Sequence, residues 1–180
     1  MNKRCLVIVI VEDAPHKMLI YRYLMQRRMG PIRIELSPSG KGSAENWVRR
    51  AFVKEISEYR RRQAQTKLIV VIDADTGTVE NRLRQLDQAL KDGGKEPVHP
   101  ASEQIARLVP RRNIETWILC LNEQEVNEET DYKRTRENWN ELIPQAAETL
   151  FQWTRSQTEP PNHCVDSLRS GVRELRRLTL

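Results

Sequence analysis

Residues 68–78 read Leu-Ile-Val-Val-Ile-Asp-Ala-Asp-Thr-Gly-Thr, and this stretch decides the predicted fold. Five apolar residues in a row, mostly β-branched, are typical of a strand buried on both faces in the middle of a parallel sheet. In such sheets, ligand-binding residues gather just beyond the carboxyl ends of the strands. Asp73 and Asp75 stand at that position, and two carboxylates one residue apart can converge on a hard cation. The alternative is that either aspartate only caps the next helix, as Thr76 or Thr78 could also do.

A second apolar run, residues 6–11, also ends in acid, at Glu12 and Asp13. Strand-like runs then alternate along the chain with stretches of helical apolar spacing. We expect strands over 6–11, 32–36, 67–72 and 105–109, and helices over about 14–29, 43–63, 78–91 and 114–121. This alternation predicts an α/β fold with a mainly parallel, Rossmann-like sheet flanked by helices.

A domain boundary is predicted near residue 121. Residues 1–121 carry the strand–helix alternation and form the expected α/β catalytic domain. Residues 122–180 contain an irregular acidic segment, a helical stretch over 139–153, a proline-containing linker over 156–162 and an amphipathic stretch over 165–178. We expect this part to be a C-terminal helical extension that packs on the α/β domain.

The composition is that of a basic protein, with a formal charge of +5 from 30 basic and 25 acidic residues. Such a balance is compatible with a polyanionic partner but does not demand one. The three cysteines lack CxxC spacing and indicate neither a disulfide framework nor a zinc site. No stretch approaches membrane-spanning length, so we expect a soluble cytoplasmic protein without a membrane partner; an oligomer is compatible with the sequence. Three histidines without metal-ligand spacing are assigned no chemistry: His16, His99 and His163.

The order of the acidic motifs resembles the Toprim domain of primases, topoisomerases and overcoming-lysogenization-defect (OLD) nucleases. In that family an apolar strand ends in Glu and, after a long segment, a second apolar strand ends in Asp-x-Asp, as in Val11-Glu12 and Ile72-Asp73-Ala74-Asp75. Residues 110–117, Pro-Arg-Arg-Asn-Ile-Glu-Thr-Trp, look like the acidic helix of small stand-alone Toprim-like proteins of bacterial anti-phage systems. The resemblance covers about residues 5–121. It departs from the family at Asp13, where the family usually has Gly.

This resemblance implies a metal-dependent nuclease that hydrolyses phosphodiester bonds, with DNA favoured over RNA as substrate. It implies Mg²⁺ or Mn²⁺ held by Asp73 and Asp75, with Glu12 as a further ligand or general acid–base. Glu115 either completes a second metal position or is an exposed helix acid. Likeness to OLD-type systems also implies an ATPase partner that controls the nuclease in anti-phage defence.

Basic side chains are the candidates for binding phosphate. Lys133 is predicted as a catalytic residue, and Arg111 and Arg112 as substrate-binding residues, which neutralise charge in the transition state. Lys41, in the Gly/Ser-rich loop 37–43, is a candidate contact to the polyanion, although the loop lacks the GxxxxGK[ST] spacing of a Walker motif. For each of these residues the alternative is a simple surface role.

Two other functions are compatible with the same residues. Residues 9–15, Val-Ile-Val-Glu-Asp-Ala-Pro, also resemble the start of a response-regulator receiver domain, in which Asp73 would be the phosphorylated residue beside bound Mg²⁺. However, Asp73 lacks the following Met-Pro turn of that family, and the late strand leads to Arg111 instead of the expected lysine. The second alternative is a non-catalytic interaction subunit whose acids are structural and whose arginines serve an interface.

Overall fold

The apolar runs form a parallel sheet, as the sequence predicts. The computed structural model describes residues 5–40, 42–62, 65–135 and 137–178, and within them the sheet has four strands in the order β2-β1-β3-β4. All three strand pairings are parallel. The strands are β1 (Leu6–Val11), β2 (Ile32–Leu36), β3 (Thr66–Val71) and β4 (Ile105–Leu108). The α/β class is therefore confirmed, and the arrangement is consistent with a Rossmann-like fold.

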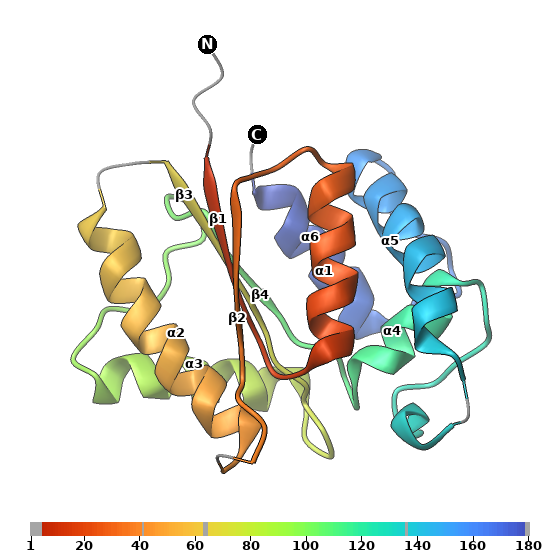
Figure 1. Cartoon of the computed structure of the whole chain (residues 1–180), viewed down its shortest axis with the longest axis horizontal. Helices are drawn as coiled ribbons and strands as arrows, with labels where there is room; N and C mark the ends of the chain where they lie inside the picture. The colour runs from red at the N-terminus through yellow and green to blue at the C-terminus, as the bar shows by residue number, and fades with distance from the viewer. Residues whose placement is uncertain (1–4, 41, 63–64, 136, 179–180) are drawn as a thin grey trace.

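Helices cover both faces of the sheet (Figure 1). On one side lie α2 (Ala44–Arg61) and α3 (Val79–Asp92); on the other lie α1 (Ala14–Gln26), α4 (Ile114–Leu121), α5 (Trp139–Arg155) and α6 (Asp166–Arg177). Successive side chains of a strand point to opposite faces. Ile8 and Val70 accordingly join the core beneath α2 and α3, whereas Val9 and Val71 join the core beneath the other four helices. Because both faces of the sheet are packed against helices, the strands hold the loops at their carboxyl ends in defined positions.

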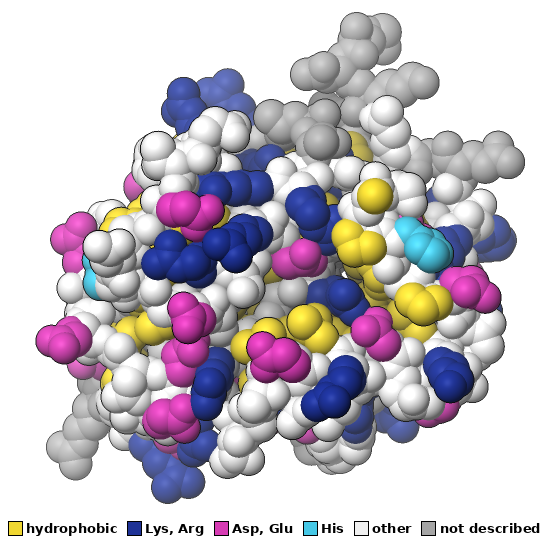
Figure 2. Space-filling model, turned by 180° about the vertical axis from the view of Figure 1, so that it is seen from behind, with side chains coloured by type: hydrophobic (Ala, Val, Ile, Leu, Met, Phe, Trp, Pro, Cys, Tyr) yellow, Lys and Arg dark blue, Asp and Glu magenta, His cyan; other side chains and the backbone are white. Residues whose placement is uncertain are grey.

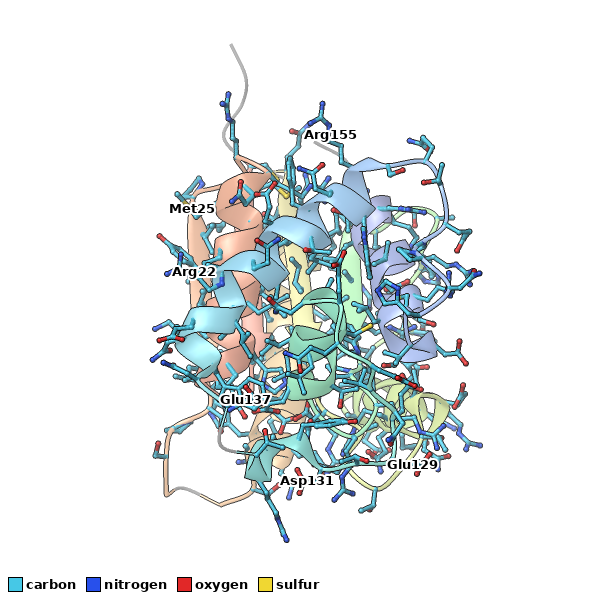
Figure 3. The ribbon with its side chains drawn as sticks, turned by 90° about the vertical axis from the view of Figure 1, so that its right-hand side faces the viewer. Arg22, Met25, Glu129, Asp131, Glu137 and Arg155 are labelled. Carbon is cyan, nitrogen blue, oxygen red and sulfur yellow. The ribbon has the colours of Figure 1, made fainter. Side chains whose placement is uncertain are left out.

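The C-terminal helices are built into the larger of these cores. Leu150 of α5 and Leu168 of α6 belong to the same buried cluster as the residues of β1 and α4, and α5 crosses α1 and α4 in the view of Figure 3. Helix α6 also covers the outer edge of β4. There Glu174 Oε2 accepts from Arg107 N at 3.0 Å, and Arg177 Nη2 donates to Ile105 O at 2.8 Å. The helices predicted over 139–153 and 165–178 are therefore present, while the boundary near residue 121 stays a prediction.

Gly171 of α6 lies directly against the indole ring of Trp117 in α4, and an added Cβ would clash with that ring. In an open helix Gly→Ala is stabilising by up to about 1 kcal/mol. Here we expect Gly171→Ala to lower the free energy of unfolding by about 1–3 kcal/mol, because Trp117 is fully buried and overpacking forces its neighbours to move. Urea denaturation measures the change, with Ser170→Ala on the same helix as the control. A stabilised Gly171→Ala variant would contradict this packing.

The face of the molecule seen in Figure 2 carries basic and acidic side chains interspersed with hydrophobic ones. This face has no extended patch of side chains with the same sign of charge, so it does not favour a polyanion-binding surface. None of the helices formed by the described residues is long and apolar enough to cross a membrane.

Candidate active site

Charged residues gather where β1 and β3, the two central strands, end. In a sheet of this strand order, the connections leaving β1 and β3 diverge to opposite faces, and the crevice between them is where ligands bind in open α/β folds. Glu12 and Asp73 are the first charged residues after these strands. Glu12 Oε1 accepts a hydrogen bond from the backbone N–H of Asp73 at 2.7 Å. The two strand ends predicted from the sequence therefore meet.

His16 stands at the centre of this site, although its spacing in the sequence indicated no chemistry. Asp13 caps the amino end of α1 and accepts from the backbone N–H of His16, which brings the imidazole to the first turn. The ring is fully buried, with Nδ1 2.5 Å from Asp13 Oδ1 and Nε2 2.9 Å from Asp73 Oδ1. The signal that could have identified it is local: an aspartate at a strand end and a histidine three residues later, in the first turn of the next helix.

The imidazole of His16 is held as a cation. Burial alone would lower its pKa, but the carboxylates of Asp73 and Asp13 outweigh burial and raise the pKa well above the ordinary value of 6.5. Burial likewise opposes the charge of Asp13, yet the bond to His16 lowers the pKa of that carboxyl to about 2. In its cationic form, which the two carboxylates favour, His16 donates from both ring nitrogens and offers no lone pair.

Lys133 supplies the second cation on Asp73. Its Nζ lies 2.9 Å from Asp73 Oδ2 and 3.6 Å from Asp13 Oδ2. It belongs to a short 3-10 turn, η1 (Tyr132–Arg134), which Asp131 fixes by accepting from Lys133 N and from Asn113 Nδ2. Figure 3 shows Asp131 at the edge of the molecule where the strands end. Burial opposes the charge of Lys133, but Asp73 and Asp13 raise its pKa above the ordinary range.

Glu115 reaches the same site from the first turn of α4. It is 3 % exposed, so the alternative that it is an exposed helix acid is wrong. Burial raises its pKa to about 7, and it interacts electrostatically with Lys133, Asp73 and Asp13. Its Oε2 is buried without a hydrogen-bond partner among the described residues. The pKa of Glu12 is raised to a similar value, about 7, by burial and by the charge of Asp73.

Asp75 lies at the rim of the site. Its side chain is 55 % exposed and its Oδ2 is 3.4 Å from Arg82 Nη2. The backbone of Asp75 is left-handed, with φ of 51°, and forms an isolated bridge to Arg112, whose φ is 65°. Two non-glycine residues that face each other in the left-handed conformation impose local backbone strain, and strain of this kind is often found at functional sites. Neither Asp73 nor Asp75 caps α3, because Thr78 does so by accepting from Asn81 N.

The two predicted substrate-binding residues that the structure describes, Arg111 and Arg112, pair with different carboxylates. Arg111 Nη2 pairs with Glu129 at 2.5 Å, and Arg112 lies 3.5 Å from Asp131, beside the turn that carries Lys133. Lys41 lies outside the described residues. Of the two that the structure describes, Arg112 is the one connected to the charged cluster.

The donor set of the site fits a divalent cation. Among the described residues, Asp13, His16 and Asp73 each offer an atom within 4.8 Å of the others. Of the four predicted metal ligands, Asp73 alone belongs to this group; Glu12, Asp75 and Glu115 do not. Carboxylate oxygens suit Mg²⁺ and Mn²⁺. A metal ligand must be deprotonated, so His16 has to lose a proton before it can coordinate an ion. Otherwise it has to move aside and leave the ion to the carboxylates of Asp13 and Asp73.

No family model matches this sequence, and the searches of curated proteins and of solved structures give no significant match.

Proposed function

We propose that the protein is a metal-dependent, Toprim-like nuclease that hydrolyses phosphodiester bonds, with DNA as the favoured substrate. The observation that carries the proposal is the convergence of Glu12, Asp73 and Glu115 with Lys133 at the ends of β1 and β3. Mg²⁺ or Mn²⁺ held there would polarise the scissile phosphate. The resemblance to OLD-type proteins supports an ATPase partner that controls cleavage in anti-phage defence.

The chain's own residues have distinct parts in this proposal. Asp73 and Asp13 would hold the cation in place of their contacts with His16 and Lys133, and Asp75 would lie at the rim of the metal site. Glu12 suits a general base, because a carboxyl with a pKa of about 7 can accept a proton from water at neutral pH. Lys133 would neutralise the negative charge that develops on the phosphate oxygens.

Supercoiled plasmid incubated with the protein and Mn²⁺ or Mg²⁺ tests the proposal. We expect nicking that depends on the metal and falls at least about 100-fold in Asp73→Ala and in Glu12→Ala, as for loss of a ligand or a general base. Glu125→Ala is the control, because Glu125 is exposed and remote in sequence from both strand ends. A parallel assay on RNA separates the two substrates.

One result would count against the nuclease, and another would move the test to the complex with the ATPase partner. Nicking that persists in Asp73→Ala would come from a contaminant. No nicking by the wild-type protein, with metal binding that still depends on Asp73, would leave cleavage to be sought with the ATPase partner present.

A receiver-like function is the second candidate, and the contact between Lys133 Nζ and Asp73 Oδ2 favours it. The expected lysine, missing from the late strand, is thus supplied by η1. Against it, Asp73 is fully buried and both of its carboxylate oxygens are engaged, by His16 and Lys133. Acetyl phosphate tests this candidate: covalent labelling that is lost in Asp73→Ala would support it over the nuclease.

A further inference from the structure

A second cavity, of about 720 Å³, lies where α1, α5 and α6 end. It is remote from the candidate active site: Figure 3 shows Met25 and Arg155 toward one end of the molecule and Asp131 at the other. The volume suits a ligand of small-molecule size, since binding pockets usually measure about 300–1,000 Å³. Met25 and Phe151 give the wall some apolar surface.

The charged lining of this cavity is entirely basic. Among the described residues that line it none is acidic, and four are arginines: Arg27, Arg28, Arg155 and Arg176. Arg27 donates to the carbonyls of Leu175 and Leu178, and Arg176 donates to two carbonyls in and after the last turn of α5. A carbonyl satisfies a donor without cancelling its charge. The three helix ends add roughly half a negative charge each, about 1.5 in all, against the charges of four arginines.

Two of the four guanidinium groups are available to a ligand. Arg28 and Arg155 are exposed, and neither side chain forms a hydrogen bond or an ion pair with another described residue. A planar guanidinium can bind two oxygens of one phosphate with a pair of parallel hydrogen bonds. The cavity therefore combines fixed positive charge with two free groups of the kind that binds phosphate.

Arg28 occupies a backbone position that usually takes glycine. Helix α1 ends with a pair of hydrogen bonds, from Arg28 N to Met25 O and from Met29 N to Leu24 O, both of 3.1 Å. The residue after the C-cap is left-handed in this arrangement, and Arg28 has a φ of 54°. Glycine adopts such a conformation without steric cost. The fold thus gives no reason for an arginine here, and a strained backbone of this kind is often found at functional sites.

We propose that this cavity binds a ligand with two or more phosphate groups, either a free nucleotide or the backbone of a nucleic-acid strand. Arg28 and Arg155 would bind the phosphates, while Arg27 and Arg176, which are fixed by carbonyls, keep the wall positive. The site is separate from the candidate active site, and the proposal does not depend on the nuclease activity.

Isothermal titration calorimetry with inorganic tripolyphosphate, in EDTA, tests the proposal. Arg28→Gly and Arg155→Gln are each expected to weaken binding at least about tenfold, as for the loss of one charged hydrogen bond. Glycine suits the left-handed backbone, so Arg28→Gly should unfold at the same urea concentration as the wild type or a higher one, which excludes misfolding as the cause. Arg22→Gln is the matched control, because Arg22 is an exposed arginine of α1 that does not line the cavity (Figure 3).

Lys133→Met separates this cavity from the candidate active site, where Lys133 lies, and should bind tripolyphosphate like the wild type. Binding of ATP that depends on Arg28 would identify a free nucleotide as the ligand, and the same dependence for a short single-stranded DNA would identify a strand. The proposal is overturned if the wild type binds no tripolyphosphate, or if binding is lost in Lys133→Met instead of Arg28→Gly. It is also overturned if Arg22→Gln weakens binding as much as Arg28→Gly, or if citrate, a tricarboxylate, binds as tightly.

Discussion

His16→Gln is expected to lower the free energy of unfolding of the metal-free protein by about 3–5 kcal/mol at pH 6, the usual result of removing one partner from a buried ion pair. His16 and Asp73 are both fully buried and 2.9 Å apart, and Asp13 is bound to the other ring nitrogen. Without the imidazolium, the two carboxylates face each other with Lys133 as their remaining cation at the site.

The pH dependence of this loss has a definite sign. The pKa of His16 is raised in the folded protein, so its stabilising contribution is complete below the unfolded value of 6.5. The contribution then decreases as the pH rises through the folded pKa. The difference between wild type and His16→Gln should therefore be largest at pH 6 and shrink in alkaline solution.

Urea denaturation in EDTA measures the effect, with His99→Gln as the control because His99 is exposed. Mn²⁺ is expected to restore part of the stability of His16→Gln, since a divalent cation would supply the positive charge that the variant lacks. A loss below about 1 kcal/mol, the value for an exposed pair, would mean that the imidazole is not needed to neutralise Asp13 and Asp73.

Glu115→Gln is expected to act in the opposite direction and to stabilise the metal-free protein. Burial raises the pKa of Glu115 from 4.5 to about 7, so folding becomes less favourable as the pH rises through this window. At about 1.4 kcal/mol per pKa unit, ionised Glu115 costs of the order of 3 kcal/mol at pH 8. The neutral glutamine removes this cost, whereas at pH 5 it should change stability by less than about 1 kcal/mol.

Urea unfolding of wild type and Glu115→Gln at pH 5 and pH 8, both in EDTA, tests this expectation. Glu125→Gln is the matched control, an exposed glutamate of the same chain. The free energy of unfolding of the Glu115→Gln variant should still depend on pH, with the same sign as in the wild type but more weakly. The reason is that the pKa of Glu12 is also raised to about 7. Equal effects of Glu115→Gln at both pH values would contradict the raised pKa.

The sequence was sufficient for the fold because the pattern and the topology agree. Runs such as residues 6–11 and 68–72 are apolar throughout, and a strand of this kind is stable only when helices cover both faces. The alternation of Ile32, Ile34 and Leu36 is typical of a strand near a sheet edge, and β2 is indeed the last strand on its side of the sheet. Parallel strands end at one edge, so the meeting of Glu12 and Asp73 could be predicted too.

The rest of the site depends on tertiary packing that periodicity does not encode. The sequence identified Lys133 and Glu115 as candidates, but their positions follow from how Asp131 anchors η1 and how α4 packs. The local spacing of Asp13 and His16 was visible, but this spacing does not show that the imidazole is buried against Asp73. Asp75 was predicted beside Asp73, whereas its left-handed backbone turns its side chain toward Arg82 at the rim.

The long interval between Asp73 and Lys133 also sets an order of events during synthesis. The pairing of β1 with β3 requires the chain only as far as residue 71, but Lys133 follows Asp73 by 60 residues. A ribosome adding about 5–20 residues per second delivers that lysine roughly 3–12 s later. Until then His16 is the only one of the two cations that contact Asp73 to have been synthesised. A chain that we propose to cut nucleic acid would thus emerge from the ribosome with its cutting centre incomplete, and finish it only when the segment around Lys133 docks.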